Sequence, residues 1–134
     1  MSAGDELQAF IVAKLRDSAE VGAICADRIY DNVPKEPAFP YISFGASDYY
    51  PDDAECIAGR VETVQLDCWS RDFGKHIEVK RLVDAVKKAL HGQSGDLGVN
   101  ALVQMRVALV RAFGDPDGIT AHGVVQVTCD IEEG

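Results

Sequence analysis

The sequence has no hydrophobic run long enough to cross a bilayer and no cysteine pair of the metal-binding type. A membrane-spanning helix needs about 20 mostly apolar residues, so we expect no membrane partner. The first residues, Met1 to Glu6, lack the basic and apolar regions of a secretory signal peptide, and we therefore expect folding in a cytoplasm.

Cysteine and histidine are few and scattered. The four cysteines are Cys25, Cys56, Cys68 and Cys129, and none of them forms a C-x-x-C pair. None of the three histidines has a ligand-type partner three or four residues further along a predicted helix. Metal sites of the zinc type need such spacing, so we expect no metal site and treat the cysteines as small core side chains of a reducing compartment.

Signatures of catalysis are also missing. The glycine-rich segment 92–98 (GQSGDLG) lacks the Lys-Ser/Thr of a phosphate-binding loop, and no G-x-S-x-G nucleophile motif is present. Trp69 beside Arg71 could stack on a base, although packing at a strand end is the simpler interpretation. We expect no catalytic residue and no cofactor.

Basic residues are outnumbered by acidic ones. The 134 residues carry 13 Lys and Arg against 22 Asp and Glu, a formal charge of −9. Sequence-specific DNA binding requires clustered cations against phosphates, so we do not expect it. An acidic surface would, however, let DNA pass without sticking. The length fits a single domain, residues 1–134.

Hydrophobic periodicity predicts an α+β fold. Leu7, Phe10, Ile11 and Leu15 give residues 5–17 one apolar stripe, and Ser18 is a candidate cap for a further short turn. Apolar spacing predicts a second helix over 74–91, and alternation predicts four strands, over residues 41–47, 61–70, 102–113 and 122–131. The simplest architecture is an antiparallel sheet of about four strands with two main helices on one face, in the order α-β-β-α-β-β.

The helix over 74–91 is expected to bury a stripe of five residues, with Val79 at its margin. These are Ile77, Leu82, Val83, Val86 and Leu90. In the strand 61–70, Val64, Leu66 and Cys68 are expected to face the core, and Trp69 to lie on the half-exposed face.

Two charged surfaces are candidates for contact with other molecules. The segment 48–59 is expected to be an acidic loop that lines a lumen or contacts a partner through Asp48, Asp52, Asp53 and Glu55. The second helix carries a candidate inter-subunit basic face formed by Lys80, Arg81, Lys87 and Lys88. Each is most simply a solvated surface, but opposed acidic and basic faces on one chain favour head-to-tail contact.

Several short motifs, in this order and spacing, resemble one family. They are PYISFG (40–45), ETVQLDCWS (62–70), AVKKALHG (85–92), DPDG (115–118) and HGVV (122–125). Together they resemble the tail-completion or tail-terminator family of long-tailed bacteriophages and gene transfer agents.

The resemblance implies a non-enzymatic structural protein. It implies a homohexameric ring that caps the head-proximal end of the tail tube, stops tube polymerisation and joins the tail to the neck. The expected partners are other copies of the chain, the tail tube protein and a neck or head-closure protein, with DNA passing through the lumen unbound. Assembly would take place in the host cytoplasm, and the product would lie in a virion or gene-transfer-agent particle. Two alternatives remain, another head-tail joining protein such as a head-closure stopper or connector, and a small ligand-binding or enzymatic α+β domain.

Overall fold

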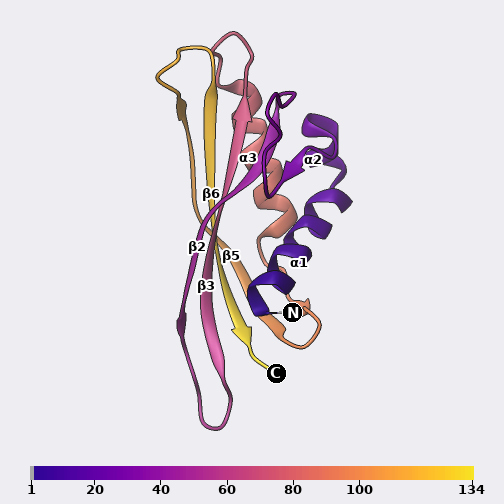
Figure 1. The fold of residues 1–134 in the computed structure, drawn as a ribbon, viewed down its shortest axis with the longest axis vertical. Coiled ribbons are helices and arrows are strands. Elements are labelled where there is room, and N and C mark those ends of the chain that lie inside the picture. The colour runs from indigo at the N-terminus through magenta and orange to yellow at the C-terminus, as the bar shows by residue number, and fades with distance from the viewer. Residues whose placement is uncertain (1) are drawn as a thin grey trace.

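The computed structural model describes residues 2–134, which form one twisted sheet with helices against one face (Figure 1). The helices are α1 (Ala3–Asp17), α2 (Ala19–Cys25) and α3 (Ile77–Leu90). The strands are β1 (Ile29–Tyr30), β2 (Tyr41–Pro51), β3 (Gly59–Ser70), β4 (Gly95–Asp96), β5 (Ala101–Gly114) and β6 (Ala121–Glu132).

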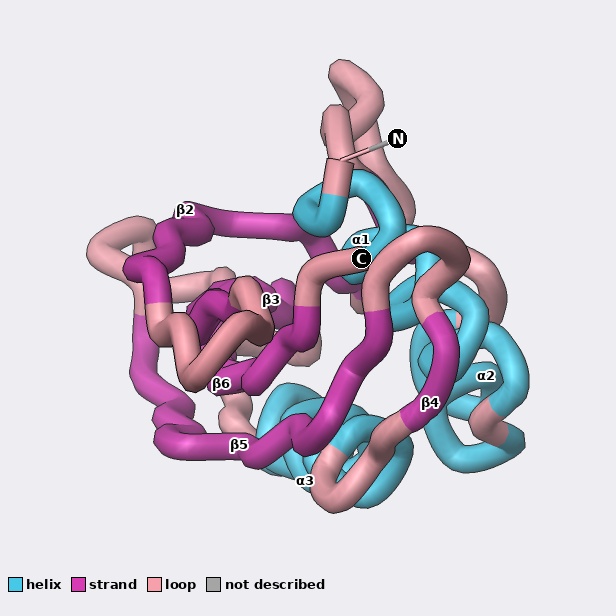
Figure 2. Tube along the Cα trace, turned by 90° about the horizontal axis from the view of Figure 1, so that it is seen from below, coloured by secondary structure: helices cyan, strands magenta, loops and turns pink. Residues whose placement is uncertain are grey.

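The sheet has six strands in the order β1-β2-β3-β6-β5-β4. All neighbours are antiparallel except β1 and β2, and the sheet is curled when seen along the strands (Figure 2). The prediction of about four strands and two helices was therefore incomplete, and the element order differs from the predicted one. The additional strands β1 and β4 have two residues each, too few for alternation to show in the sequence.

The core lies between the helices and the facing side of the sheet. Leu66 and Cys68 of β3 are fully buried and Val64 is nearly so, as predicted. On α1, Leu7, Ile11 and Leu15 are fully buried, whereas Phe10 is only partly buried. The other side of the sheet carries no helix, and we call it the open face (Figure 1).

The predicted stripe of α3 needs one correction. Ile77 is 54% exposed, whereas Val79, expected at the margin, is fully buried. The helix begins at Ile77 instead of Gly74. At 3.6 residues per turn, Ile77 lies above Arg81 and Asp84 on the solvent side, so it cannot join the buried stripe.

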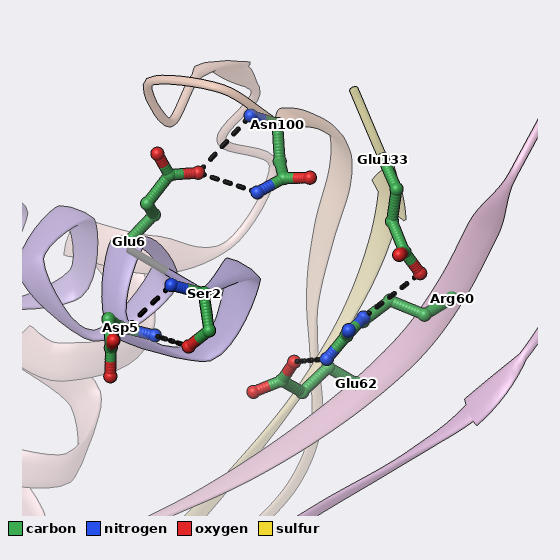
Figure 3. A network of polar contacts seen from close by, with 7 residues as sticks. All are labelled: Ser2, Asp5, Glu6, Arg60, Glu62, Asn100 and Glu133. Carbon is green, nitrogen blue, oxygen red and sulfur yellow. Dashed lines mark hydrogen bonds and ion pairs between the residues drawn. The ribbon is translucent and has the colours of Figure 1, made fainter.

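The start of α1 is held to the segment before β5 by a buried carboxylate. Glu6 accepts hydrogen bonds from the Val99 N–H (2.8 Å), the Asn100 N–H (3.1 Å) and the Asn100 side-chain amide (2.7 Å); Figure 3 shows the Asn100 bonds. These donors, the Val99 N–H first, lower the pKa of Glu6. Ser2 and Asp5 form a capping box at the same helix end, which is also drawn in Figure 3.

One predicted cap is confirmed, and a glycine follows the end of α3. The Ser18 hydroxyl accepts from the Val21 N–H at the start of α2, and Gly92 has a positive φ just after α3.

Candidate assembly surfaces

The acidic segment is a projecting hairpin and not a long loop. Strand β2 continues to Pro51 and β3 begins at Gly59, so only residues 52–58 form the turn. The expectation of a loop over 48–59 was wrong for residues 48–51 and for Gly59, which belong to strands. Residues 48–51 are exposed on both sides and show no hydrophobic alternation, so the sequence did not mark them as a strand. We call residues 45–62 the acidic hairpin. It extends past the helices at one end of the molecule (Figure 1).

The four acidic residues predicted to contact a partner do not form one cluster at the tip of the hairpin. Asp48 lies within β2, opposite Thr63 of β3, whereas Asp52, Asp53 and Glu55 lie in the turn. All four are exposed. Within the turn, the Asp53 carboxylate accepts from the Gly59 N–H at 2.9 Å, which connects the turn to the start of β3.

An ion-pair cluster lies next to the turn of the hairpin. Arg60 pairs with Glu62 at 3.3 Å and with Glu133 at 3.2 Å (Figure 3), and its guanidinium stacks over the Tyr49 ring at 3.6 Å. Burial raises the pKa of Glu62 despite the neighbouring Arg60. This cluster ties the start of β3 to Glu133, just after β6, and sequence analysis did not identify it.

Large apolar side chains on the hairpin are exposed. Tyr49 and Tyr50 are 56% and 60% exposed, and Ile57 is 49% exposed. Aromatic residues at such positions are typical of protein interfaces. The sequence did contain a signal, two consecutive tyrosines in an otherwise polar segment. It was overlooked because the segment was interpreted only by its acidic residues.

The four basic residues of α3 share its solvent-exposed side. Lys80, Arg81, Lys87 and Lys88 are all exposed. Within residues 2–134, Lys88 alone among them forms an ion pair, with Glu20 of α2 at 3.6 Å. This pair is largely solvated and contributes little to stability. The basic face of α3 lies on the helical side of the molecule, and the fold does not bring it together with the acidic turn (Figure 1).

Trp69 packs within the open face. Its ring stacks on His122 with centroids 3.8 Å apart, and its indole N–H donates to the Ser43 hydroxyl at 3.1 Å. His122 in turn contacts the Asp67 carboxylate at 2.7 Å. The sheet-packing interpretation of Trp69 is therefore confirmed. Arg71 lies over the Phe39 ring and donates to Thr120, so it is held within the fold as well.

Within residues 2–134, no three His, Cys, Asp or Glu side chains come together as metal ligands would. Cys25, Cys68 and Cys129 are buried and Cys56 is exposed in the hairpin turn. Burial raises the pKa of Cys25 to about 11 and that of Cys129 to about 12. None of the described helices is long and apolar enough to span a membrane.

Comparison with known proteins gives one family and a matching fold. The sequence matches the family described as Tail completion protein gp17 over residues 9–132. A search of curated proteins finds no match. The fold is similar to a chain in the solved structure of the virion of a native gene transfer agent (GTA) particle, with a TM-score of 0.89, 23% identity and 98% of each chain covered. Since the family match spans nearly the whole sequence, the chain belongs to the tail completion protein gp17 family.

Proposed function

We propose that the protein is a tail terminator, a ring at the head-proximal end of the tail tube that stops tube polymerisation and joins the tail to the neck. The observation that carries the proposal is the family match over residues 9–132, which together with the GTA-particle fold likeness accounts for almost the whole chain. The function of the protein is then structural, in particle assembly, and not catalytic.

The surfaces of the chain suit a ring of identical subunits. The acidic hairpin and the basic face of α3 lie on different parts of the molecule. Complementary surfaces at different places make a head-to-tail contact, which closes into a ring when the rotation between copies fits. We expect six copies in the host cytoplasm, which then become part of the particle.

The net charge of −9 suits a passage for DNA. An acidic lining repels phosphates and keeps the genome from binding as it moves through the opening. Asp52, Asp53 and Glu55 of the hairpin turn are the candidates for this lining or for contact with the tail tube or neck protein.

Gene deletion tests the proposal. Loss of a terminator should give overlong or headless tails, and complementation with the intact chain should restore normal tail length. Deletion that leaves tail length normal while filled heads leak their DNA would instead assign the chain to head closure. Both structural roles would be refuted if the protein is a stable monomer with a defined catalytic turnover and particles assemble normally when its gene is deleted.

A further inference from the structure

Both long outer strands of the sheet have open edges. Strand β1 covers β2 only at Ile42 and Ser43, so in the described part of the chain no strand pairs with the outer edge of residues 44–51. On the opposite side, β4 covers β5 at Ala101 and Leu102, and residues 91–93 bond to its next section. No strand within residues 2–134 pairs with the outer edge of β5 over 108–114.

An open edge of this length is unusual for a protein that works alone. Monomeric proteins protect such edges, because the unpaired N–H and C=O groups recruit other strands. Here the open edges carry exposed apolar side chains, with Tyr50 on β2 at 60% and Leu109 on β5 at 41% exposure. The two edges also differ in charge, since β2 carries Asp48 and no basic residue, and β5 carries Arg106 and Arg111 and no acidic residue.

We propose that the neighbours in the ring are joined by strand pairing, with β2 of one copy adding antiparallel to β5 of the next. The proposal rests on the ring of the proposed function and specifies its contact. Rotation about a ring axis preserves the component of each strand's direction along that axis. Because β2 and β5 run in opposite directions within one chain, the junction continues the antiparallel sheet.

Charge and side-chain direction select one register, with Arg111 opposite Asp48. Residues directly opposite each other in a sheet share a face. Asp48 pairs with Thr63, which shares the open face with Trp69 because the two are six residues apart on β3. Arg111 lies on the same face, since its partner Val124 pairs with Asp67 of β3. Both charged side chains are exposed and would meet.

The same register brings the two exposed apolar residues together. Counting two positions back from Arg111 and two forward from Asp48 sets Leu109 opposite Tyr50. Tyr50 pairs with Val61 and Leu109 with Gln126, and both therefore also lie on the open face. Aromatic and aliphatic cross-strand pairs stabilise antiparallel sheets, so one register satisfies both the charge and the apolar contacts.

The register also predicts a strand tilt that can close a ring. Within one chain, Arg111 is level with Asp67 of β3, whereas Asp48 is level with Thr63, four residues away. That offset is about 13 Å along the strands for about 19 Å of sheet width, four strands at about 4.8 Å each, which gives a tilt of about 35°. Strands in closed barrels tilt by roughly 35–45°. Six copies would enclose a backbone diameter of about 45 Å by the same spacing, enough for a DNA duplex to pass.

Cysteine cross-linking on the chain assembled at tail-tube ends tests the register. Asp48→Cys and Arg111→Cys are combined in a Cys56→Ser background, because opposite residues lie within disulfide reach. We expect oxidation to give a ladder of covalent multimers that reducing agent dissolves. The matched control carries Asp48→Cys with Phe113→Cys, two residues out of register, and should cross-link at least about tenfold less.

Charge reversal gives a second readout and tests α3 as the rival contact. Arg111→Glu should weaken ring formation at least about tenfold, and Asp48→Arg in the same chain should restore it. Arg16→Glu on α1, an exposed residue outside both candidate surfaces, is the matched control and should leave rings unchanged, whereas Lys87→Glu tests the basic face of α3 as the rival contact.

The outcomes separate this inference from the proposed function. Wild-type chain that forms no ring at tube ends refutes the terminator role and the strand pairing with it. A different result overturns only the strand pairing. In that case rings form normally but do not cross-link between positions 48 and 111, and Lys87→Glu dissolves them while Arg111→Glu does not.

Discussion

Gly123 of β6 sets how closely α3 packs on the sheet, and adding one methyl group there is a sharp test of the fold. A Cβ atom at this position would lie 2.5 Å from Val83 Cγ1, 3.0 Å from Val79 Cγ2 and 3.3 Å from Cys68 Cβ. Carbon atoms in contact lie about 3.5–4.0 Å apart. Gly123→Ala therefore forces α3 away from the sheet by about 1 Å at this point.

The valines cannot relieve this contact by rotating, because valine in a helix has one strongly preferred rotamer. Overpacking of a filled core costs about 1–3 kcal/mol. For a chain of 134 residues this lowers the melting temperature by roughly 4 °C per kcal/mol. Urea unfolding of Gly123→Ala should therefore show a lower midpoint with an unchanged slope.

A double-mutant cycle separates this cause from others. Val83→Ala alone should cost about 2 kcal/mol from lost burial and the cavity left behind. Combined with Gly123→Ala, the cost should fall short of the sum by at least about 1 kcal/mol, because the removed methyl groups make room for the new one. Gly22→Ala is the control, since nothing lies within 4 Å of the added Cβ, and it should stabilise α2. Additive costs for Gly123 and Val83 would refute the steric explanation.

Three further predictions concern titration, ion pairing and thiol access. Glu6, whose folded pKa lies below its ordinary 4.5, stabilises the fold above that pH and loses this contribution as pH falls through the folded pKa; the stability gap between wild type and Glu6→Gln in urea unfolding should therefore narrow as the pH falls below 4.5 toward the folded pKa, and a constant gap would contradict it. Arg60→Ala leaves Glu62 buried without its cation and should cost about 1–3 kcal/mol, whereas Arg60→Ala with Glu62→Gln should recover part of that loss in the same assay. A thiol reagent should modify Cys56 in the native protein and the other cysteines only on unfolding, because these are buried and the pKa of Cys129, for example, is raised to about 12; rapid reaction of all four thiols would refute the packing of the core.

Hydrophobic periodicity predicted the helices and strands that bury one side in the core and expose the other side to solvent. The stripe of α3 from Leu82 to Leu90 and the core face of β3 follow from apolar spacing alone, because burial on one face leaves a regular pattern. The helix N-terminus was misplaced because His76, at the cap position, makes no side-chain cap hydrogen bond, so no Ser, Thr, Asp or Asn marked the start. Elements of two residues and the cluster around Arg60 depend on contacts distant in sequence, which no local pattern encodes.

The section of β2 beyond Ser47 was missed for a reason that bears on function. A strand in a monomer normally buries one face, and that burial creates the alternation by which it is found in a sequence. Residues 45–51 are exposed throughout, so they gain little from the core of their own chain. Their extended form depends on hydrogen bonds to β3, and within residues 2–134 no strand pairs with their outer edge and both tyrosines are exposed. A strand built in this way is stabilised further when another chain covers it. The failure of the pattern at this segment therefore points to the same place as the open edge and the exposed tyrosines, an interface that the isolated chain leaves unfilled.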